Sequence, residues 1–389
     1  MKQKPFHTSN VLLLSFSHFI HDIYTSFLAP LLPLIIEKLS LSLGQAGLLS
    51  AVHQLPSLFN PVIGVFADRR GLVRWLVILA PTMTAIPMCF LGAVPSYPLL
   101  MILLFVAGIS VALYHVPAPV LVARASGMKK GRGMSFFMTG GEAARTLGPV
   151  VAVGSVSLFG LEGFYPVAVV AVATSLLLYF KLEKIEPPEK KAVRPSFFSG
   201  FNEIKPVLIP LSGILTARAF MHSAMGIFLP VYIEQQTGNL WYAGAALAFY
   251  EAFGVAGVLS AGILSDRMGR KKVLLAALVA APAALALFVV TAGPVRFIMM
   301  IAAGFAILST APVMLAIVQE NAPNNPAAAN GLYMMVSFAV RSATIVVVGF
   351  LGDVTGLSTM YMICALAGLG AIPFLMRLPT MESESDSTL

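Results

Sequence analysis

The sequence has little charge, few cysteines and none of the common motifs of soluble enzymes. Only 11% of its 389 residues are charged and 58% are hydrophobic, whereas a soluble domain carries about 25% charged residues, so a soluble globular fold is excluded. Both cysteines, Cys89 and Cys364, lie in apolar stretches, which excludes a disulfide framework and a CxxC metal or redox site. The sequence contains no P-loop, HExxH or GxSxG motif, so we expect neither direct use of ATP, nor an enzyme, nor a cofactor.

Long apolar runs make up most of the chain, and the mean hydropathy is +0.87. Short polar breaks separate about twelve runs of roughly 20 to 27 residues, each long enough to cross a bilayer as a helix. We therefore expect an all-α integral membrane protein with twelve transmembrane helices in two six-helix, pseudo-symmetric bundles. The expected spans are 11–36, 45–67, 72–94, 97–123, 133–159, 162–182, 206–234, 240–265, 273–292, 295–319, 327–351 and 356–378.

The net charge of +8 comes from basic residues in alternate connections between the expected spans. These connections hold 20 of the 25 Lys and Arg, whereas the opposite connections hold only Lys38 and Arg296. Because basic residues are retained on the cytoplasmic side, both termini are expected in the cytoplasm. The charge therefore indicates the topology of a protein embedded in a lipid bilayer, and no nucleic-acid partner is expected.

A charged segment divides the chain into two halves. Residues 183–205 are rich in Lys, Glu and Pro and are expected to form a cytoplasmic linker. The linker separates an N-terminal bundle, residues 1–182, from a C-terminal bundle, residues 206–380. The acidic and Ser-rich tail, residues 381–389, is expected to be disordered.

Several sequence features recur in both halves, as expected of a duplicated bundle. Pro30 and Pro230 occupy matching positions in the first span of each half, and a Gly-x-x-x-Asp-Arg-x-Gly motif occurs twice in connections expected to be cytoplasmic. The motif residues are Gly64, Asp68, Arg69 and Gly71 in the first copy and Gly262, Asp266, Arg267 and Gly269 in the second. Glycine permits a tight turn, and Arg can pair with Asp. Arg270, Lys271 and Lys272, which follow, are interpreted as topology signals.

The repeated motif resembles the signature of the major facilitator superfamily. That resemblance implies two related six-helix halves around a central cavity and assigns the motif to a latch of the cytoplasmic gate. Three further motifs resemble those of the fosmidomycin resistance proteins, a family of bacterial drug-efflux transporters within the superfamily. These motifs are Ser17-His18-Phe19-Ile20-His21-Asp22, Tyr114-His115-Val116-Pro117, and Gly140-Gly141 with Leu147-Gly148-Pro149. The narrower resemblance implies a multi-pass protein of the prokaryotic plasma (inner) membrane with a role in antibiotic resistance.

Ionisable side chains inside the apolar spans are the candidate functional residues, because charge in a bilayer core is costly unless it is paired. His18 with Asp22 and Arg218 with His222 are i,i+4 pairs, so the members of each pair share a helix face. The two faces belong to matching spans of the two halves, and we expect them to meet around water.

Asp22 is the first candidate to carry a proton, because burial favours the neutral acid and a nearby cation favours the carboxylate. The proton-coupling candidates are Asp22, Glu251, His18, His222 and Glu142. Arginine remains charged and suits an anionic substrate. The substrate-binding candidates are Arg145, Arg218, Arg341, His21, His115, Tyr24 and Tyr250. An alternative for Glu142 with Arg145 is a static ion pair that fixes helix packing.

His18, His21 and Asp22 are of types that chelate metals, but helix geometry places His21 only partly beside the other two, so no metal is expected. The leading hypothesis is proton-coupled efflux (antiport) of a small anionic or amphiphilic organic compound or drug. A monomer would carry it out by alternating access, with protons as the coupling ion. The alternative is a proton symporter or facilitator that imports an anionic metabolite. A membrane sensor or scaffold that transports nothing is the third hypothesis.

Overall fold

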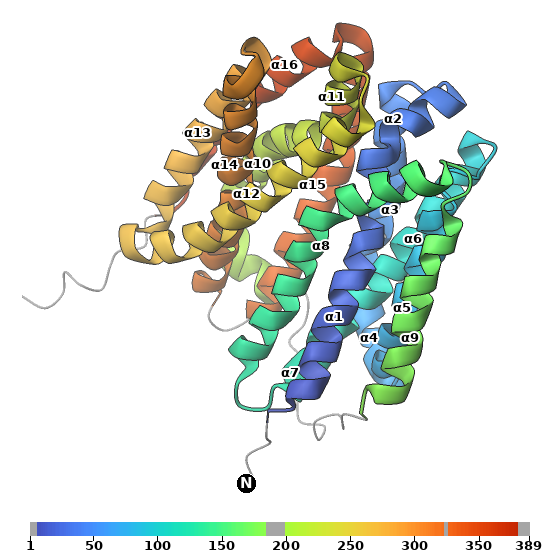
Figure 1. The fold of residues 1–389 in the computed structure, drawn as a ribbon. Helices are drawn as coiled ribbons and strands as arrows, with labels where there is room; N and C mark the ends of the chain where they lie inside the picture. The colour runs from blue at the N-terminus through green and yellow to red at the C-terminus, as the bar shows by residue number, and fades with distance from the viewer. Residues whose placement is uncertain (1–5, 184–198, 323–325, 380–389) are drawn as a thin grey trace, which may run out of the picture.

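Helices account for every regular element in the described part of the chain, residues 6–183, 199–322 and 326–379 of a computed structural model (Figure 1). The expectation of an all-α fold is confirmed. The elements of the N-terminal half are α1 (Thr8–Thr25), α2 (Leu28–Leu39), α3 (Leu43–Gln54), η1 (Leu55–Phe59), α4 (Asn60–Arg70), α5 (Val73–Cys89), α6 (Tyr97–His115), α7 (Pro117–Ala125), α8 (Lys130–Phe159), η2 (Tyr165–Ala168) and α9 (Val169–Lys181).

The second half has the same character, with long helices and a few short ones. Its elements are α10 (Ser199–Ser223), a π-helical turn η3 (Ala224–Phe228), α11 (Leu229–Thr237), α12 (Leu240–Met268), α13 (Arg270–Val290), α14 (Gly293–Glu320), α15 (Pro326–Thr355), α16 (Leu357–Leu369) and α17 (Ala371–Met376). The expected span 206–234 coincides with the apolar stretch Ile204–Thr237, but α10 begins earlier, at Ser199, so Pro206 lies inside the helix and residues 199–205 of the expected linker are helical. Residues 184–198 of the expected linker and the tail 381–389 lie outside the described residues.

Proline explains where expected spans are divided into shorter helices. A proline has no N–H, so it removes the helical hydrogen bond to the carbonyl four residues earlier. Pro30 and Pro230 follow the breaks between α1 and α2 and between η3 and α11, and Pro117 begins α7 directly after α6. The expected continuous helix over 45–67 is interrupted in the same way by η1, which contains Pro56.

Eight helical stretches of the described chain are long and apolar enough to cross a membrane. They are Thr8–Leu39, Tyr97–Ala125, Ile204–Thr237, Leu240–Met268, Arg270–Val290, Gly293–Glu320, Ala329–Thr355 and Leu357–Met376. Two shorter apolar helices, Val73–Cys89 and Tyr165–Lys181, fall on other expected spans. The remaining expected spans coincide with α3 to α4 and with α8, which carries Glu142 and Arg145.

The two halves pack through two helix pairs, α3 on α15 and α8 on α12, and through α2 on α11 (Figure 1). Glycines allow the close approach of these helices. A Cβ added at Gly47 would lie 2.7 Å from the carbonyl oxygen of Ile345, and one at Gly349 would lie 2.4 Å from that of Leu43. A Cβ at Gly244 would lie 2.7 Å from the Val153 side chain.

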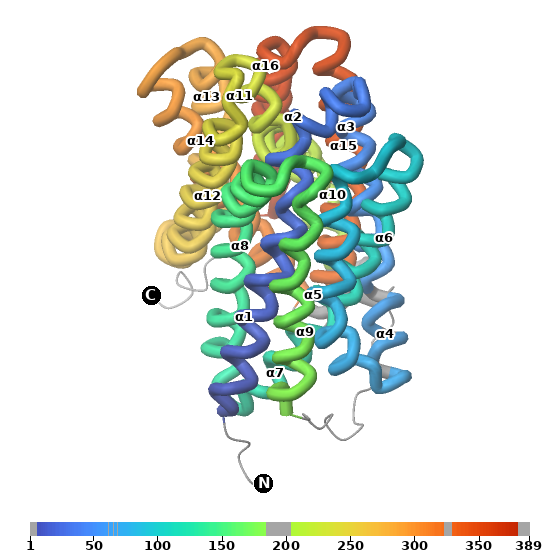
Figure 2. The backbone as a smooth tube through the Cα atoms, turned by 45° about the vertical axis from the view of Figure 1, so that its right-hand side comes forward, coloured from blue at the N-terminus to red at the C-terminus, as the bar shows by residue number. Residues whose placement is uncertain are grey.

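These close contacts lie toward the end of the molecule that holds α2, α11 and α16, which we call the α2–α11 end (Figure 2). Toward the opposite end, near α4 and α7, the helices α12 and α13 diverge from α1 and α8 (Figure 1). We call this the loose end. The halves are therefore packed together at the α2–α11 end and diverge toward the other.

Candidate functional site

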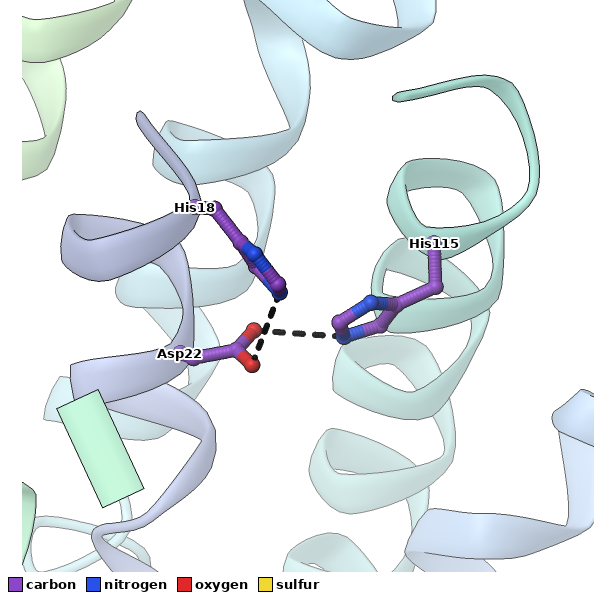
Figure 3. A group of neighbouring side chains, drawn as sticks. All are labelled: His18, Asp22 and His115. Atoms are coloured by element: carbon purple, nitrogen blue, oxygen red, sulfur yellow. Dashed lines mark ion pairs between the residues drawn. The ribbon is translucent and has the colours of Figure 1, made fainter. Parts of the chain in front are cut away.

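Asp22 of α1 lies among three histidine side chains, two of which are drawn in Figure 3. Its Oδ2 is 3.2 Å from Nε2 of His18, and its Oδ1 is 3.2 Å from Nε2 of His115 and 2.8 Å from Nδ1 of His21. The Asp22 side chain is only 11% exposed. The charge expected inside the first span is thus surrounded by imidazoles from α1 and α6.

His18 is held in a single orientation by its neighbours. Its Nδ1 lies 2.7 Å from the backbone carbonyl oxygen of Phe137, which can only accept, so Nδ1 donates and Nε2 is turned toward Asp22. The imidazole stacks on the Phe137 ring at 4.0 Å between centroids. Gly141 of α8 makes room for it, because a Cβ there would lie 2.5 Å from Cε1 of His18.

His21 is fully buried and continues the hydrogen-bond chain away from Asp22. Its Nε2 is 3.0 Å from the Thr84 hydroxyl of α5, which lies 2.7 Å from the Ser110 hydroxyl of α6. The ring stacks on Tyr114 at 4.2 Å. A side chain with no exposed surface and both ring nitrogens engaged does not fit the substrate contact expected for His21. The roles of Thr84 and Ser110 carried no sequence signal, because small polar residues are common in membrane helices, whereas Tyr114 was already part of the Tyr114-His115-Val116-Pro117 motif.

His115 is the last residue of α6, directly before the break that Pro117 imposes. It was expected to contact substrate, and the structure places it against Asp22 with 34% of its side chain exposed. Among the described residues, His18, Asp22 and His115 form a group with metal-ligand spacing, since their ligand atoms all lie within 4.8 Å of one another. His115, rather than His21, therefore completes the chelating set.

A separate cavity of about 200 Å³ lies between the halves and is lined by charged side chains. Three helices contribute these side chains: Arg145 (α8), Arg218 and His222 (α10) and Arg341 (α15). The rest of the lining is Leu215, Ala219, Val258, Leu308, Ala311 and Ser337. The cavity lining includes Arg218 and His222 but neither His18 nor Asp22, and the described residues contain no ion pair between Asp22 and Arg218. Each pair instead belongs to its own group.

Arg145 is shared by two acidic side chains. It forms an ion pair with Glu142 one turn earlier on α8, and its Nε lies 4.0 Å from Oε2 of Glu251 on α12. The side chain of Glu142 is 19% exposed and that of Glu251 is 14% exposed, whereas the side chain of Arg145 is 43% exposed. The ion pair joins the two halves next to the cavity and leaves part of the guanidinium open to it.

The other two arginines of the cavity differ in how they are held. The Nε of Arg218 donates to the carbonyl oxygen of Ile307 at 3.0 Å and to the Thr310 hydroxyl at 2.6 Å. The Nε of Arg341 is buried and has no hydrogen-bond partner among the described residues. His222 lies beside Tyr250, with 3.4 Å between Nδ1 and the hydroxyl. The cavity thus contains one anchored guanidinium and one that still has a free donor.

Tyr24 does not fit its expected substrate contact. It is 2% exposed, and its hydroxyl donates to the carbonyl oxygen of Val167 at 2.8 Å. Tyr250 is also fully buried and touches the cavity only through His222. Both rings pack in the core, so their hydroxyls serve structural hydrogen bonds.

The two gate motifs form turns at the end opposite α2 and α11. Gly71 and Gly269 have φ values of +66° and +93°, which explains glycine at these positions. Gly64 faces Val116, Arg69 and Arg267 are exposed, and the side chain of Asp68 lies outside the described part. In the second copy, Asp266 pairs with Arg270.

Arg270 also bonds Glu320 of α14 at 2.8 Å and the Ser265 hydroxyl. The interpretation of Arg270 as a topology signal alone was incomplete, because this side chain, at the start of α13, bonds residues of both α12 and α14. The sequence did not indicate the bond to Glu320, because this residue of α14 lies 50 positions after Arg270 in the chain.

Comparison with known proteins agrees with this architecture. The Uncharacterized MFS-type transporter YfnC of Bacillus subtilis (strain 168) is 24% identical over 382 residues, which cover 94% of this chain and 92% of that protein. The Fosmidomycin resistance protein of Escherichia coli (strain K12) is 23% identical over 366 residues, covering 92% and 89%. The crystal structure of a bacterial homolog to the human lysosomal transporter Spinster, in an inward-facing conformation, superposes with a TM-score of 0.78 at 18% identity and covers 96% and 95%.

Residues 14–345 match the sequence profile described as Major Facilitator Superfamily, which is most of the chain. The resemblance expected from the repeated gate motif and from the His18, His115 and Gly140 motifs is confirmed. The chain therefore belongs to the Major Facilitator Superfamily, and it is a multi-pass membrane transporter, not an enzyme.

Proposed function

We propose that this protein exports a small organic compound with an anionic group, in exchange for protons, across a prokaryotic plasma membrane. The observation that carries the proposal is the cavity between the halves, where Arg145, Arg218 and Arg341 meet. Three guanidinium groups in about 200 Å³ repel one another, and an anionic group relieves that repulsion. The relative named Fosmidomycin resistance protein supports outward transport of a drug-like molecule.

The topology proposed for this function has twelve spans with both termini in the cytoplasm. Eight stretches meet the length and hydropathy of a span, and α5, α9, α8 and the run from α3 to α4 complete the set. With this topology the α2–α11 end faces outward, and the loose end faces the cytoplasm. The protein then has an inward-facing conformation, and rocking of the halves around the cavity gives alternating access.

The proton step is assigned to Glu251 and Glu142. Both carboxylates share Arg145, so their protonation is linked to whatever else binds this guanidinium. A substrate that places a donor or cationic group on Glu251 competes with protons for the same carboxylate, and such competition produces exchange. We do not assign the proton step to Asp22 or His18, because among the described residues they contact each other and not a residue that lines the cavity.

A second candidate, proton symport of a purely anionic metabolite, is favoured by the position of Arg145. Protonation of Glu251 removes a competing anion from Arg145 and so strengthens binding of an anionic substrate to it. Substrate and proton then bind together and move in the same direction. The charge of the substrate therefore decides between exchange and symport.

The test is flux in proteoliposomes under an imposed pH gradient, with fosmidomycin as the first probe. Exchange predicts that an acidic lumen drives accumulation of the probe and that lowering the pH weakens its binding. Symport predicts the opposite sign for both measurements. Flux that ignores the pH gradient in the wild type, while Arg341→Gln abolishes it, would rule out proton coupling but keep the anion cavity.

A further inference from the structure

Outside the arginine-lined cavity, the group around Asp22 has the composition and spacing of a metal site. We propose that His18, Asp22 and His115 form a binding site for a divalent transition-metal ion of the Zn²⁺ class. The ligands would be Nε2 of both histidines and the carboxylate of Asp22 (Figure 3). This proposal does not depend on the transported substrate or on proton coupling.

The distances between the ligand atoms fit such an ion. Each histidine Nε2 lies 3.2 Å from a different oxygen of Asp22. In a tetrahedral site with metal–ligand bonds of about 2.0 to 2.1 Å, neighbouring ligand atoms lie about 3.3 Å apart. Two of the three separations already match this value, and all three ligand atoms lie within 4.8 Å of one another, so rotation of the side chains can place them around one ion.

The residues behind the ligands provide the orientation that metal sites require. A metal-binding histidine usually donates its other ring N–H to a carbonyl or carboxylate, which fixes the tautomer and exposes the ligating nitrogen. His18 does so through the Phe137 carbonyl at 2.7 Å. His21 bonds Asp22 at 2.8 Å and is itself held by Thr84 at 3.0 Å, so the carboxylate is also oriented from outside.

The site has a closed side and an open side. Stacking on Phe137 and the contact with Gly141 enclose His18, which is 5% exposed, whereas His115 at the end of α6 is 34% exposed. A fourth coordination position therefore faces the open side, available to water or to a ligand group. Two imidazoles and one carboxylate favour Zn²⁺, Co²⁺ or Ni²⁺ over Mg²⁺ or Ca²⁺, which prefer oxygen ligands alone.

The experiment measures binding of Co²⁺ and Zn²⁺ to the full-length protein in detergent, after removal of any histidine tag. Visible absorption of Co²⁺ reports its coordination, and displacement by Zn²⁺ gives the affinity of the second ion. We expect one ion per chain with a tetrahedral or five-coordinate Co²⁺ spectrum. His115→Gln and Asp22→Asn should abolish this spectrum, whereas the matched control His53→Gln, a histidine of α3 outside the group, should retain it.

A second set of variants distinguishes loss of a ligand from loss of the fold. Thr84→Val removes the hydroxyl that bonds His21 and Ser110 but leaves all three ligands in place, so it should keep one ion per chain and weaken binding by about 10- to 100-fold. Each variant is accepted only if it elutes as the wild type in size-exclusion chromatography. Binding that is unchanged in monodisperse His115→Gln, or stoichiometric binding that is lost equally in His53→Gln, would overturn the proposal. An absorption spectrum typical of octahedral Co²⁺ in the wild type would also overturn the proposal.

Discussion

The carboxylate of Asp353, near the end of α15, accepts a hydrogen bond from the backbone N–H of Leu43, the first residue of α3, at 2.6 Å. A second bond comes from the N–H of Gly44 at 2.8 Å. The first N–H groups of a helix have no partner inside it and carry partial positive charge, so an anion there is favourable. Here that anion comes from the other half of the transporter and joins the two halves at the α2–α11 end.

Replacing Asp353 should therefore loosen this end. Asp353→Ala removes both acceptors, and the loss of such a cap costs about 0.5–2 kcal/mol, which shifts a two-state closure equilibrium by about 2- to 30-fold. The measurement is labelling of Ala311→Cys, in the cavity lining, by a membrane-impermeant maleimide from the α2–α11 side. Labelling should rise in the Ala variant and stay close to the parent level in Asp353→Asn, which keeps an acceptor. Equal labelling of all three proteins contradicts a latch at this position.

Arg145 and Glu251 should behave as a coupled pair in stability but not in transport. Arg145→Gln leaves two poorly exposed carboxylates without their cation, and loss of one partner from such a pair costs at most about 3 kcal/mol where the group is partly exposed. The double variant Arg145→Gln/Glu251→Gln removes one of the two charges and should recover part of the lost thermal stability. Transport should remain low in both variants, because the anion-binding guanidinium is absent. Additive stability losses would show that the 4.0 Å contact carries no coupling.

Substitution of Arg341 should weaken substrate binding more than loss of one hydrogen bond from the Nε of Arg218, the anchored neighbour. The Arg341 Nε has no partner among the described residues, whereas the Arg218 Nε already donates twice. Arg341→Lys keeps the charge but loses the planar fork, so we expect KM for an anionic substrate to rise at least tenfold. Thr310→Val removes one bond from Arg218 and leaves the Ile307 carbonyl, so a rise of only a few fold is expected. The reverse order of the two effects would reject this assignment.

The sequence predicted the all-α fold and most span positions, because each depends on local composition. The apolar runs, the repeated prolines and the two gate motifs are all visible without knowledge of any tertiary contact. Membrane helices also limit the alternatives, since backbone groups inside lipid must be bonded within the helix. The break at η1 and the early start of α10 were missed, because a proline signals a lost hydrogen bond and not where the helix ends.

The sequence did not predict how the ionisable residues are distributed between sites. It expected the face of His18 and Asp22 to meet that of Arg218 and His222 because the two pairs match in the repeat, but symmetry of position does not require contact. Asp22 instead meets His115, whose orientation depends on the break between α6 and α7. Tyr24 and His21 were expected to contact substrate for a related reason, namely that both are polar residues inside an apolar span. A polar side chain can instead form its hydrogen bonds with another helix and remain buried.

A pH-dependent contact joins Lys38, at the end of α2, to Glu162, in the turn between α8 and η2. Lys38 at the end of α2 bonds Glu162 at 2.5 Å and the carbonyl oxygen of Gly92 at 2.6 Å. The hydrogen bond and positive charge of Lys38 lower the pKa of Glu162. A lowered carboxyl pKa means that the pair stabilises the fold above the ordinary Glu value of about 4.3, and the gain is lost as the pH falls further.

The corresponding experiment compares thermal unfolding midpoints of the wild type and Glu162→Gln across pH. The wild type should have a slightly higher midpoint near neutral pH, and the difference should disappear in acid. The effect is small because Glu162 is fully exposed and screened by water. Glu37→Gln, at an exposed neighbour that forms no ion pair among the described residues, is the control variant. A difference that grows in acid has the wrong sign for this contact.

Gly141 tests whether the orientation of His18 matters, because its contact with the imidazole can be changed without altering a ligand. A Cβ at Gly141 would lie 2.5 Å from Cε1 and 2.8 Å from Nε2 of His18, so Gly141→Ala must move the imidazole away from Asp22 or from the Phe137 carbonyl. We expect weaker Co²⁺ binding and a lower unfolding midpoint. Gly131→Ala on the same helix meets nothing within 4 Å, and alanine is favoured over glycine in a helix by about 0.8–1 kcal/mol, so that variant should keep the metal affinity and gain stability. If both variants bind Co²⁺ like the wild type, His18 tolerates displacement and is not a ligand.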